Sequence, residues 1–395
     1  MNVFKLIGAF IARKPLTWSF HILTLALGVG VVTSLVLLDR ALEDRFSRDL
    51  AGVDLVVGAK GSPLQLILSA LFEIDVPTGN IKLSQAQMLA ANHMVKASAP
   101  VSLGDSVGTI RIVGTTPAFG DLYAARLAQG RWWSQPMEVV LGAQAATQLK
   151  LGPGSTFVGQ HGLSPGGEMH SASPYRVVGV LSPTGAVIDR LALTDTASVW
   201  KVHETETPAP AGDQDREVTA LLIKYRSPMG ALMMPRMVTA MPDVQAAVPA
   251  IEVGRLTQLL GAGSTVLRGF GVGLLAISAL GFFIALFAAV NQRQRELALL
   301  RALGAHPSLL LALVAGEGML LGLLGGALGV ALARIAAGVA SCAAAASGGP
   351  ALNLPPFGPL ELAALGVALA IALIASLLPG LVAYRLDPAQ ALKSS

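Results

Sequence analysis

The lysine and serine that come nearest to a nucleotide-binding arrangement lie in residues 58–62, GAKGS. In a phosphate-binding loop of the form G-x-x-x-x-G-K-[ST], the lysine contacts the phosphates and the adjacent hydroxyl binds Mg²⁺. Here a glycine separates Lys60 from Ser62, so the two side chains cannot share one nucleotide. The sequence also contains no G-x-S-x-G, H-E-x-x-H or C-x-x-C pattern. It therefore predicts no hydrolase site and no cofactor bound by this chain.

The closest approach to a metal-ligand set lies between His161 and His170. These histidines are nine residues apart, with Glu168 between them. The spacing matches no recurring metal site, and the surrounding glycines and prolines are typical of a loop. We predict no metal site.

Residues 291–308, NQRQRELALLRALGAHPS, combine basic and apolar side chains in a way that suits docking rather than catalysis. Most of these residue types favour helices, Gly304 fits a helix C-terminus, and Pro307 fits the start of the next helix. The apolar positions are Leu297, Leu299, Leu300 and Leu303, and the basic ones are Arg293, Arg295 and Arg301. The segment is predicted to form a short amphipathic helix that docks on a cytosolic partner. The alternative is a loop whose charges only orient the flanking membrane helices.

Glu317 is the one acidic residue well inside a long apolar run, about 15 Å beyond Pro307 at the helical rise. An ionisable side chain there tends to face protein or water, so it is a functional candidate, or else a structural hydrogen-bonding group. The same run contains closely spaced glycines, Gly322, Gly325, Gly326 and Gly329. Small residues at this spacing let helix backbones approach closely, although a generic Gly/Ala-rich membrane helix would contain them too.

Residues 62–74, SPLQLILSALFEI, are strongly apolar and lie outside the long apolar runs. At helical spacing one face collects Leu64, Ile67, Leu68, Leu71 and Phe72. The segment is either a helix packed in a core or an interfacial helix that touches lipid or an apolar cargo.

The composition indicates a membrane protein. Of 395 residues, 53% are hydrophobic and only 13% are charged, against about a quarter charged in soluble domains. Uncharged or nearly uncharged runs occupy residues 16–38, 270–290, 307–333 and 362–381, each long enough to cross a bilayer core of about 30 Å. The first is too long for a cleaved signal peptide, so we predict an uncleaved membrane helix. A net charge of +4 argues against nucleic acid, and Cys342 alone permits no intramolecular disulfide.

The basic residues predict the orientation. Nine lie outside residues 39–268, and eight of these fall in residues 1–15, 291–306 and 382–395. By the positive-inside rule these segments are cytoplasmic, while residues 39–268 and the short loop 334–361 are outside.

Residues 39–268 have the composition of a soluble domain, and their pattern predicts an α/β fold. The expected strands are residues 53–57, 109–113, 137–141, 175–181, 198–202 and 218–225, and the expected helices are residues 83–96 and 122–127. Residues 203–217 are polar and proline-rich, which predicts an exposed loop.

Several of these segments together resemble the permease subunits of the MacB- and FtsX-like ABC transporter superfamily. The resemblance rests on QRQRELALLRALGA at residues 292–305, on the glycine-rich run around Glu317, and on LLPGLVAYRLDPAQAL at residues 377–392. In the external part it rests on GRWWSQPMEVVLGAQAATQLKLGPGS at residues 130–155 and YRVVGVLSPTG at residues 175–185.

The resemblance implies four transmembrane helices with a large α/β extracytoplasmic domain inserted between the first two. That domain would be discontinuous, with residues 39–130 and 217–268 in one subdomain and residues 131–215 in an inserted β-rich subdomain. It also implies that residues 292–301 form a coupling helix on a separate ABC ATPase, which would bind ATP and Mg²⁺. The residues expected to carry this contact are Gln292, Arg293, Arg295, Glu296, Leu299, Leu300, Arg301, Leu303 and Gly304.

The resemblance further implies a homodimeric bacterial inner-membrane permease that works by mechanotransmission, with Glu317 and the four glycines packing helices or the dimer. Its cargo would be a lipoprotein, lipid, peptide or hydrophobic compound, handled at the outer face with a possible periplasmic adaptor. The alternative is an FtsX-like regulator that activates an extracytoplasmic cell-wall hydrolase without transporting a substrate.

Overall fold

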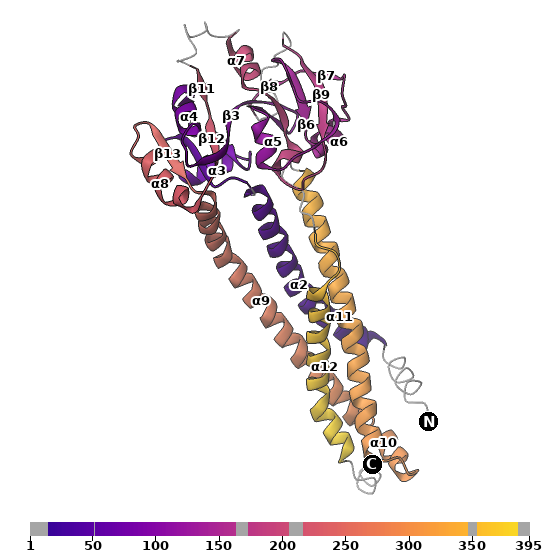
Figure 1. Ribbon diagram of the computed structural model, residues 1–395. Coiled ribbons are helices and arrows are strands. Elements are labelled where there is room, and N and C mark those ends of the chain that lie inside the picture. Colours follow the sequence, from indigo (N-terminus) through magenta and orange to yellow (C-terminus); the bar gives the residue numbers. More distant parts are fainter. Residues whose placement is uncertain (1–14, 51, 163–172, 205–215, 347–353, 386–395) are drawn as a thin grey trace. The chain divides into compact units, whose positions relative to one another are not determined.

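The computed structural model describes residues 15–50, 52–162, 173–204, 216–346 and 354–385 (Figure 1). The predicted loop around Glu168 and His170, and most of the loop 203–217, therefore lie outside the described residues. The chain divides into two compact units. The membrane unit comprises Met1–Leu42 and Leu260–Ser395, and the external unit comprises Glu43–Leu259.

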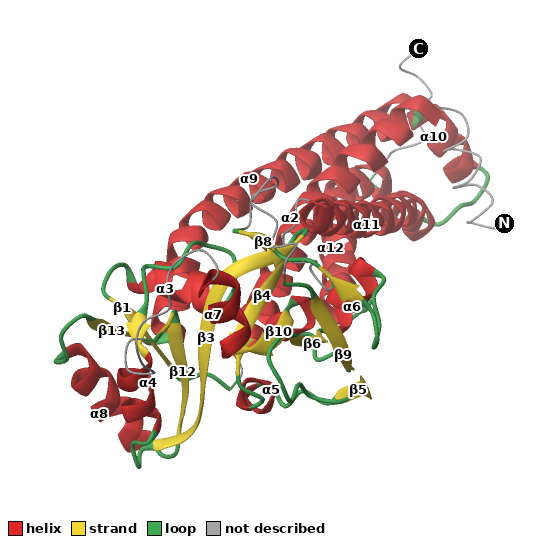
Figure 2. Ribbon diagram, turned by 90° about the horizontal axis from the view of Figure 1, so that it is seen from above, coloured by secondary structure: helices red, strands yellow, loops and turns green. Residues whose placement is uncertain are grey.

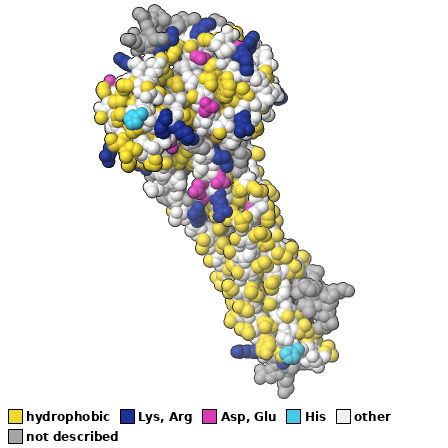
Figure 3. All heavy atoms as spheres, viewed as in Figure 1, with side chains coloured by type: hydrophobic (Ala, Val, Ile, Leu, Met, Phe, Trp, Pro, Cys, Tyr) yellow, Lys and Arg dark blue, Asp and Glu magenta, His cyan; other side chains and the backbone are white. Residues whose placement is uncertain are grey.

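Four long apolar helices dominate the membrane unit, and they make the chain a multi-pass membrane protein. These are α2 (Pro15–Leu50), α9 (Pro249–Gln292), α11 (Pro307–Ala346) and α12 (Pro359–Tyr384), with the short α10 (Gln294–Ala302) between α9 and α11. Each predicted apolar run lies within one of them. The helices extend beyond the runs, since α2 and α9 also contribute residues to the external unit. In the space-filling view the surface of the helical part is largely hydrophobic, as lipid contact requires (Figure 3).

Small residues bring α11 and α12 together. A Cβ added at Gly318, Gly322 or Gly326 would lie 2.9, 2.3 or 2.8 Å from side-chain atoms of α12. The partners, in the same order, are Ser376, Ala372 and Ala368. Residue numbers fall along α12 as they rise along α11, so the two helices pack antiparallel. Between lipid-embedded helices, where apolar burial gives little driving force, such close packing is a main source of stability.

The other glycines of α11 face α2. A Cβ at Gly325 would lie 3.0 Å from Leu25, and one at Gly329 would lie 2.8 Å from the carbonyl oxygen of Ala26. The four glycines predicted to pack helices or the dimer therefore contact helices of their own chain. A further role for them in a dimer stays a prediction.

The external unit is built on an eleven-stranded mixed sheet within the described residues, in the order β13-β1-β12-β3-β4-β10-β6-β9-β5, with β7 on β9 and β8 on β3. A separate ribbon pairs β11 with β2. The strands are β1 (Leu55–Ala59), β2 (Ile81–Lys82), β3 (Val95–Val107), β4 (Ile110–Thr115), β5 (Leu127–Gly130), β6 (Glu138–Leu141), β7 (Thr156–Phe157), β8 (Gln160–His161), β9 (Tyr175–Leu181), β10 (Ala192–Asp195), β11 (Glu217–Val218), β12 (Ala220–Tyr225) and β13 (Val244–Ala247).

Strand β3 joins the two halves of this sheet (Figure 2). Its first half pairs with β12 from Val95 to Val101, and its second half pairs with β4 from Ser102 to Val107. The subdomain boundary near residue 130 that the resemblance implies stays a prediction, but the strand pairing does not follow it. Strands β4 and β5 precede that residue but pair with β10 and β9 of the second half, so the division falls within β3.

Short helices cover the sheet: α3 (Pro63–Ala70), α4 (Leu83–Ala90), α5 (Ala118–Leu122), α6 (Ala143–Leu149), the 3₁₀ turn η1 (Val187–Arg190), α7 (Thr196–Glu204) and α8 (Pro228–Thr239). The predicted strand at residues 198–202 lies in α7. The Asp195 carboxylate accepts a hydrogen bond from the Ala197 amide at 2.8 Å, which starts a helix, and Val199 and Val202 then share its buried face.

Two predicted helices end or begin elsewhere. The helix expected over residues 83–96 stops at Ala90, because Asn92 Oδ1 accepts the amide of Met94 at 3.0 Å and turns the chain into β3. The helix expected over residues 122–127 is displaced, since α5 ends at Leu122 and Leu127 begins β5. In both segments the residue types favour a helix, but a local turn ends the helix earlier than predicted.

The apolar segment 62–74 is a core helix for most of its predicted face. Ser62 caps α3 by accepting the Gln65 amide at 3.3 Å. Ile67, Leu71 and Phe72 are at most 2% exposed within the main core, while Leu64 and Leu68 are half-buried. These three side chains therefore do not form a cargo or lipid surface.

Candidate functional site

The loop between α9 and α11 contains a distinct short helix, as the sequence predicts. Helix α9 ends at Gln292, and Arg293 adopts φ −107° and ψ 12° before α10 begins at Gln294. At the other end Gly304 has φ +93°, a left-handed conformation that favours glycine. The Ala305 amide donates to the Leu300 carbonyl at 2.9 Å, which closes the helix C-terminus.

One face of α10 is packed inside the membrane unit. Leu297 and Ala298 are at most 3% exposed, and Leu300 packs beside them. Their partners are Val290, Leu310, Leu313, Val314 and Ala383, from α9, α11 and α12. Leu300 was predicted to contact a partner, but it helps to hold α10 in place instead.

The opposite face of α10 is open. Leu299 is 53% exposed and Leu303 is 84% exposed, and they lie four residues apart. Of the other residues predicted to dock, Gln292, Arg295 and Gly304 are exposed, while Glu296 and Arg301 are half-buried. A short apolar strip flanked by arginine is thus available on a helix whose other side is fixed.

Arg293 joins the beginning of α10 to α11. Its Nη1 lies 3.3 and 3.4 Å from the two carboxylate oxygens of Glu317, which is 5% exposed. The membrane-embedded acid therefore has a cationic partner within its own chain, as buried charges generally require. Arg293 faces this partner rather than the outer side of α10.

Among the described residues of the membrane unit, three ion pairs join neighbouring long helices or their connecting segments. Besides Arg293–Glu317, Arg268 of α9 pairs with Asp39 of α2, and Arg334 of α11 contacts Glu361 of α12 at 2.5 Å. Along α11 the charges at Glu317 and Arg334 are separated by about 26 Å at the helical rise, close to a bilayer core of about 30 Å. Glu317 and Arg334 thus bound the central part of α11, while the apolar residues 309–316 precede Glu317 on the same helix.

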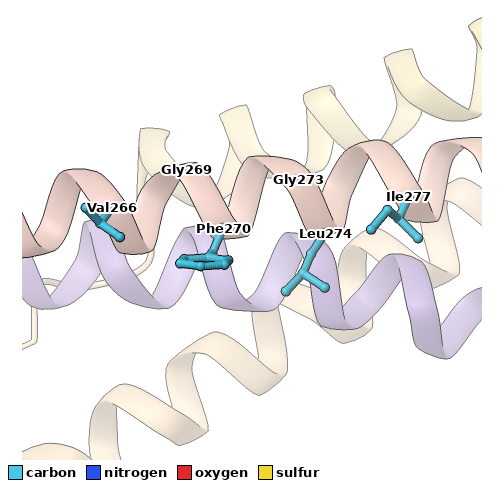
Figure 4. A pocket seen from close by; sticks show the side chains of 6 residues that line it. All are labelled: Val266, Gly269, Phe270, Gly273, Leu274 and Ile277. Carbon is cyan, nitrogen blue, oxygen red and sulfur yellow. The ribbon is translucent and has the colours of Figure 1, made fainter.

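Helix α9 also carries an open apolar groove of about 400 Å³ (Figure 4). Its lining residues all come from this helix: Val266, Gly269, Phe270, Gly273, Leu274 and Ile277. No described atom lies within 4 Å of where a Cβ would stand at Gly269 or Gly273. This face differs from the glycine faces of α11, which neighbouring helices fill.

Two family models match this architecture in order along the chain. The MacB-like periplasmic core domain matches residues 19–228, more than half of the chain, and the FtsX-like permease C-terminal domain matches residues 268–388. The chain belongs to the MacB- and FtsX-like family of ABC transporter permeases. Its α10 lies within the FtsX-like region.

Curated relatives agree with this assignment. The macrolide export ATP-binding/permease protein MacB of Shewanella oneidensis is 25% identical over 308 residues, covering 75% of this chain and 45% of that protein. MacB of Shewanella sp. strain ANA-3 is 24% identical over 316 residues, with the same coverage. The permease thus spans less than half the length of these relatives. Among solved structures, the extracellular domain of the noncanonic ABC-type transporter YknZ from Gram-positive bacteria matches 49% of this chain and 98% of its own, at 11% identity and a TM-score of 0.32.

The permease has a second group of charged residues that the sequence does not single out, at the external end of α2. Asp49 is 1% exposed and lies 3.4 Å from Arg45 and 3.8 Å from Arg190, while Arg48 Nε donates to the Gly185 carbonyl at 3.3 Å. Phe46 packs edge-on against Phe72, with ring centroids 5.4 Å apart. The last turns of α2 are therefore fixed in the core of the external unit. The one sequence signal was the Arg45–Asp49 pair at helical spacing.

A buried acid lies close to this junction. Glu73 has φ +59° and pairs with Arg111 at 3.5 Å, and the Arg111 Nη2 also donates to the Asp75 carbonyl at 3.1 Å. Burial raises the pKa of the Glu73 carboxyl to about 7, although Arg111 acts in the opposite direction. Burial, together with the charges of Asp49 and Glu73, raises the pKa of the Tyr123 hydroxyl. These side chains form one buried polar group beside the end of α2.

A different acid stabilises the segment that carries the family resemblance. Glu138 is 2% exposed and accepts two hydrogen bonds from Arg131, at 2.8 and 2.6 Å, and one from Arg176 at 3.2 Å. The Arg131 hydrogen bonds hold the pKa of Glu138 well below its usual range. This network ties residues 131–138 to β9, and nothing in it points to catalysis.

Proposed function

We propose that this chain is the permease subunit of a MacB-like ABC system, in which a separate ABC ATPase docks on α10. The observation that carries the proposal is the exposed strip of Leu299 and Leu303 on a helix whose other face is packed. An apolar strip of this kind fits a groove in a partner, with Arg295 at its rim. The ATPase would bind ATP and Mg²⁺, and this chain would bind neither.

The connections that leave α10 support a proposal of mechanotransmission. Movement of α10 acts on α11 through the Arg293–Glu317 pair and on α9 through the chain itself. The Asp39–Arg268 pair then links α9 to α2. Both α2 and α9 continue into the external unit, where Asp49 and Phe46 fix the end of α2. Work done at α10 would in this way change the shape of the external domain without a substrate crossing the bilayer.

The proposed orientation places both termini and α10 in the cytoplasm and the external unit in the periplasm of a bacterial inner membrane. It is supported by the eight basic residues on one side and by the match of residues 19–228 to a periplasmic core domain. We also propose a homodimer, with the unfilled groove on α9 as a face that a second copy or lipid covers.

Transport is favoured over FtsX-like regulation by the external domain. The FtsX-like match covers only residues 268–388, which both kinds of protein would share, whereas the external domain matches a MacB-like core. The curated relatives are described as macrolide exporters. We propose a hydrophobic compound, lipid, lipoprotein or peptide as cargo, handled at the outer face.

The decisive variant is Leu299→Asp, which places a charge on the exposed strip without touching the packed face. We expect loss of co-purification of the ATPase and loss of stimulated ATPase activity in liposomes, with normal membrane insertion. Arg295→Ala is the matched control on the same helix. It should retain most binding, since rim charges mainly tune association rate. If Leu299→Asp binds and stimulates like the wild type, α10 is not the docking element.

A further inference from the structure

The methionines of this chain are unevenly distributed. Five of the 11 lie between Met229 and Met241, and another two lie at Met88 and Met94 of the same unit, whereas the long apolar helices contain only Met319. Methionine used simply as an apolar filler would be expected in those helices as well. The concentration at α8 therefore points to a property of the thioether group.

The spacing on α8 places these thioethers along one side. Met229, Met233 and Met237 follow one another at intervals of four residues, so their side chains are neighbours on the helix surface. Met229 and Met233 are 57% and 51% exposed, while Met237 is half-buried. Met234, one position further, is fully buried in the core. Met237 and Met241 also pack against this core, whereas Met229 and Met233 are presented to solvent.

A neighbouring turn brings a second kind of donor to this side of α8. The Asn92 side-chain nitrogen lies 3.8 Å from the sulfur of Met237, which places the turn between α4 and β3 against the helix. The same turn is held by Asn92 Oδ1, which accepts the Met94 amide, and by the Met94 carbonyl, which accepts the Arg226 amide at 2.8 Å. His93 lies in this turn and is exposed. His93 therefore belongs to a turn that contacts α8 beside Met237.

The chemistry of these donors selects the ligand. Thioethers are soft donors that favour Cu(I) and similar ions, imidazole also suits copper, and hard divalent ions prefer oxygen. Among the described residues no group of three His, Cys, Asp or Glu is arranged to hold a metal, so a harder site does not compete. The external unit also contains no cysteine. Two methionines four residues apart, each with three rotatable bonds, can bring both sulfurs to one ion.

We propose that Met233 and Met237 of α8, with His93 of the adjoining turn, bind one soft monovalent cation of the Cu(I) or Ag(I) type. The site is independent of the proposed docking of an ATPase, since it involves only residues of the external unit. Such a site would give the external unit a metal ligand, whereas the two MacB relatives are described as macrolide export proteins.

The test is Ag(I) binding to the full-length protein in detergent and chloride-free buffer, measured by isothermal titration calorimetry. The background is Cys342→Ser, because the exposed thiol of Cys342 would bind Ag(I) itself. The key variants are Met233→Leu and Met237→Leu, which keep size and apolarity but remove the sulfur. Outer-shell changes alone cost metal sites about 10–100-fold in affinity, so losing a ligand should weaken binding at least tenfold.

We expect one Ag(I) bound per chain, weakened by either leucine variant and by His93→Ala, and unchanged by the control Met319→Leu on α11. Thermal unfolding of each variant would show that the fold is retained. If the double variant Met233→Leu/Met237→Leu binds Ag(I) as tightly as the parent, the proposal is wrong. The exposed methionines would then serve only as an apolar surface, a role that leucine fills equally well.

Discussion

Helices α11 and α9 are both glycine-rich and both apolar, yet their glycines meet different surroundings. Along α11, Gly318, Gly322 and Gly326 are in contact with α12, and Gly325 and Gly329 are in contact with α2. Along α9, Gly271 approaches Val32 of α2, whereas Gly269 and Gly273 meet no described atom. A glycine in a membrane helix therefore marks a packing site only where a neighbouring helix fills the space. This difference divides the unit into a tightly packed centre at α11 and an open side at α9.

We expect a large loss of folded protein from a substitution at the closest contact on α11. In Gly322→Leu the new side chain would collide with Ala372, since even a Cβ would lie 2.3 Å away. We expect α11 and α12 to separate and most folded protein to be lost, because overpacking of even a few atoms costs about 1–3 kcal/mol and backbone contact prevents relief. The measurement is the monodisperse fraction in detergent by size-exclusion chromatography.

The matched controls lie two residues apart on α9. Gly273→Leu has open space and should leave the folded fraction unchanged. Gly271→Leu faces Val32, where a Cβ would lie 2.8 Å away, and should cause an intermediate loss. Equal damage from Gly322→Leu and Gly273→Leu would show that α9 is packed as tightly as α11. A loss of dimer in Gly273→Leu with an intact protomer would assign the open side of α9 to a second copy.

The ion pairs of the membrane unit also differ in how far their side chains are buried. Glu317 and Arg293 have side chains 7% and 14% exposed, whereas Asp39 and Arg268 are 33% and 49% exposed. Removing one partner of a buried pair typically costs about 3–5 kcal/mol, while an exposed pair contributes about 0–1 kcal/mol. We therefore expect Glu317→Ala to lower thermal stability strongly and Asp39→Ala to change it little.

The double variant Arg293→Met/Glu317→Met provides the control for this interpretation. If the loss in Glu317→Ala reflects an unpaired buried charge, replacing both partners by apolar side chains should recover much of the stability. A double variant as unstable as the single one would mean that the pair contributes directly. Recovery of stability together with uncoupled ATPase activity would assign the pair to force transfer.

The four spans and the class of the external domain were predictable, because charge-free runs of membrane length and β-branched runs are local signals. Strand β9 was predicted at its observed bounds, Tyr175–Leu181. The errors at α7 and after α4 arose where one side chain, Asp195 or Asn92, redirects the backbone against the surrounding composition.

The partners of buried charges could not be predicted in the same way. Asp49 meets Arg190, and Glu73 meets Arg111, through folding of distant segments whose spacing carries no periodic signal. Glu317 was recognised as unusual, but Arg293 was placed on the docking side of α10 because both faces of that helix carry arginine and leucine. The two faces of α10 can be distinguished only from the packing of one of them against α11.

A pH-dependent effect is expected in the external unit, where the Glu73 carboxylate is buried beside Arg111. Burial raises the pKa of Glu73 to about 7 in the folded protein, whereas a glutamate in the unfolded chain has a pKa of about 4.3. Between these two pH values the folded protein therefore keeps a proton on Glu73 that the unfolded chain has released. The stability that this group contributes is therefore full below pH 4 and falls as the pH rises from about 4.3 to 7, by on the order of 4 kcal/mol. Thermal unfolding of the full-length protein should show a lower midpoint at pH 8 than at pH 5, and Glu73→Gln should remove most of that difference.

Glu138→Gln is the matched control, in which no change in the pH dependence is expected. Since Arg131 holds the pKa of Glu138 well below its usual range, this acid is ionised in both states between pH 5 and 8. Its loss should lower stability at both pH values without changing the difference. If Glu73→Gln keeps the full pH dependence, the titrating group lies elsewhere. The buried acid beside the end of α2 would then act, like the Arg293–Glu317 pair, as a fixed charge.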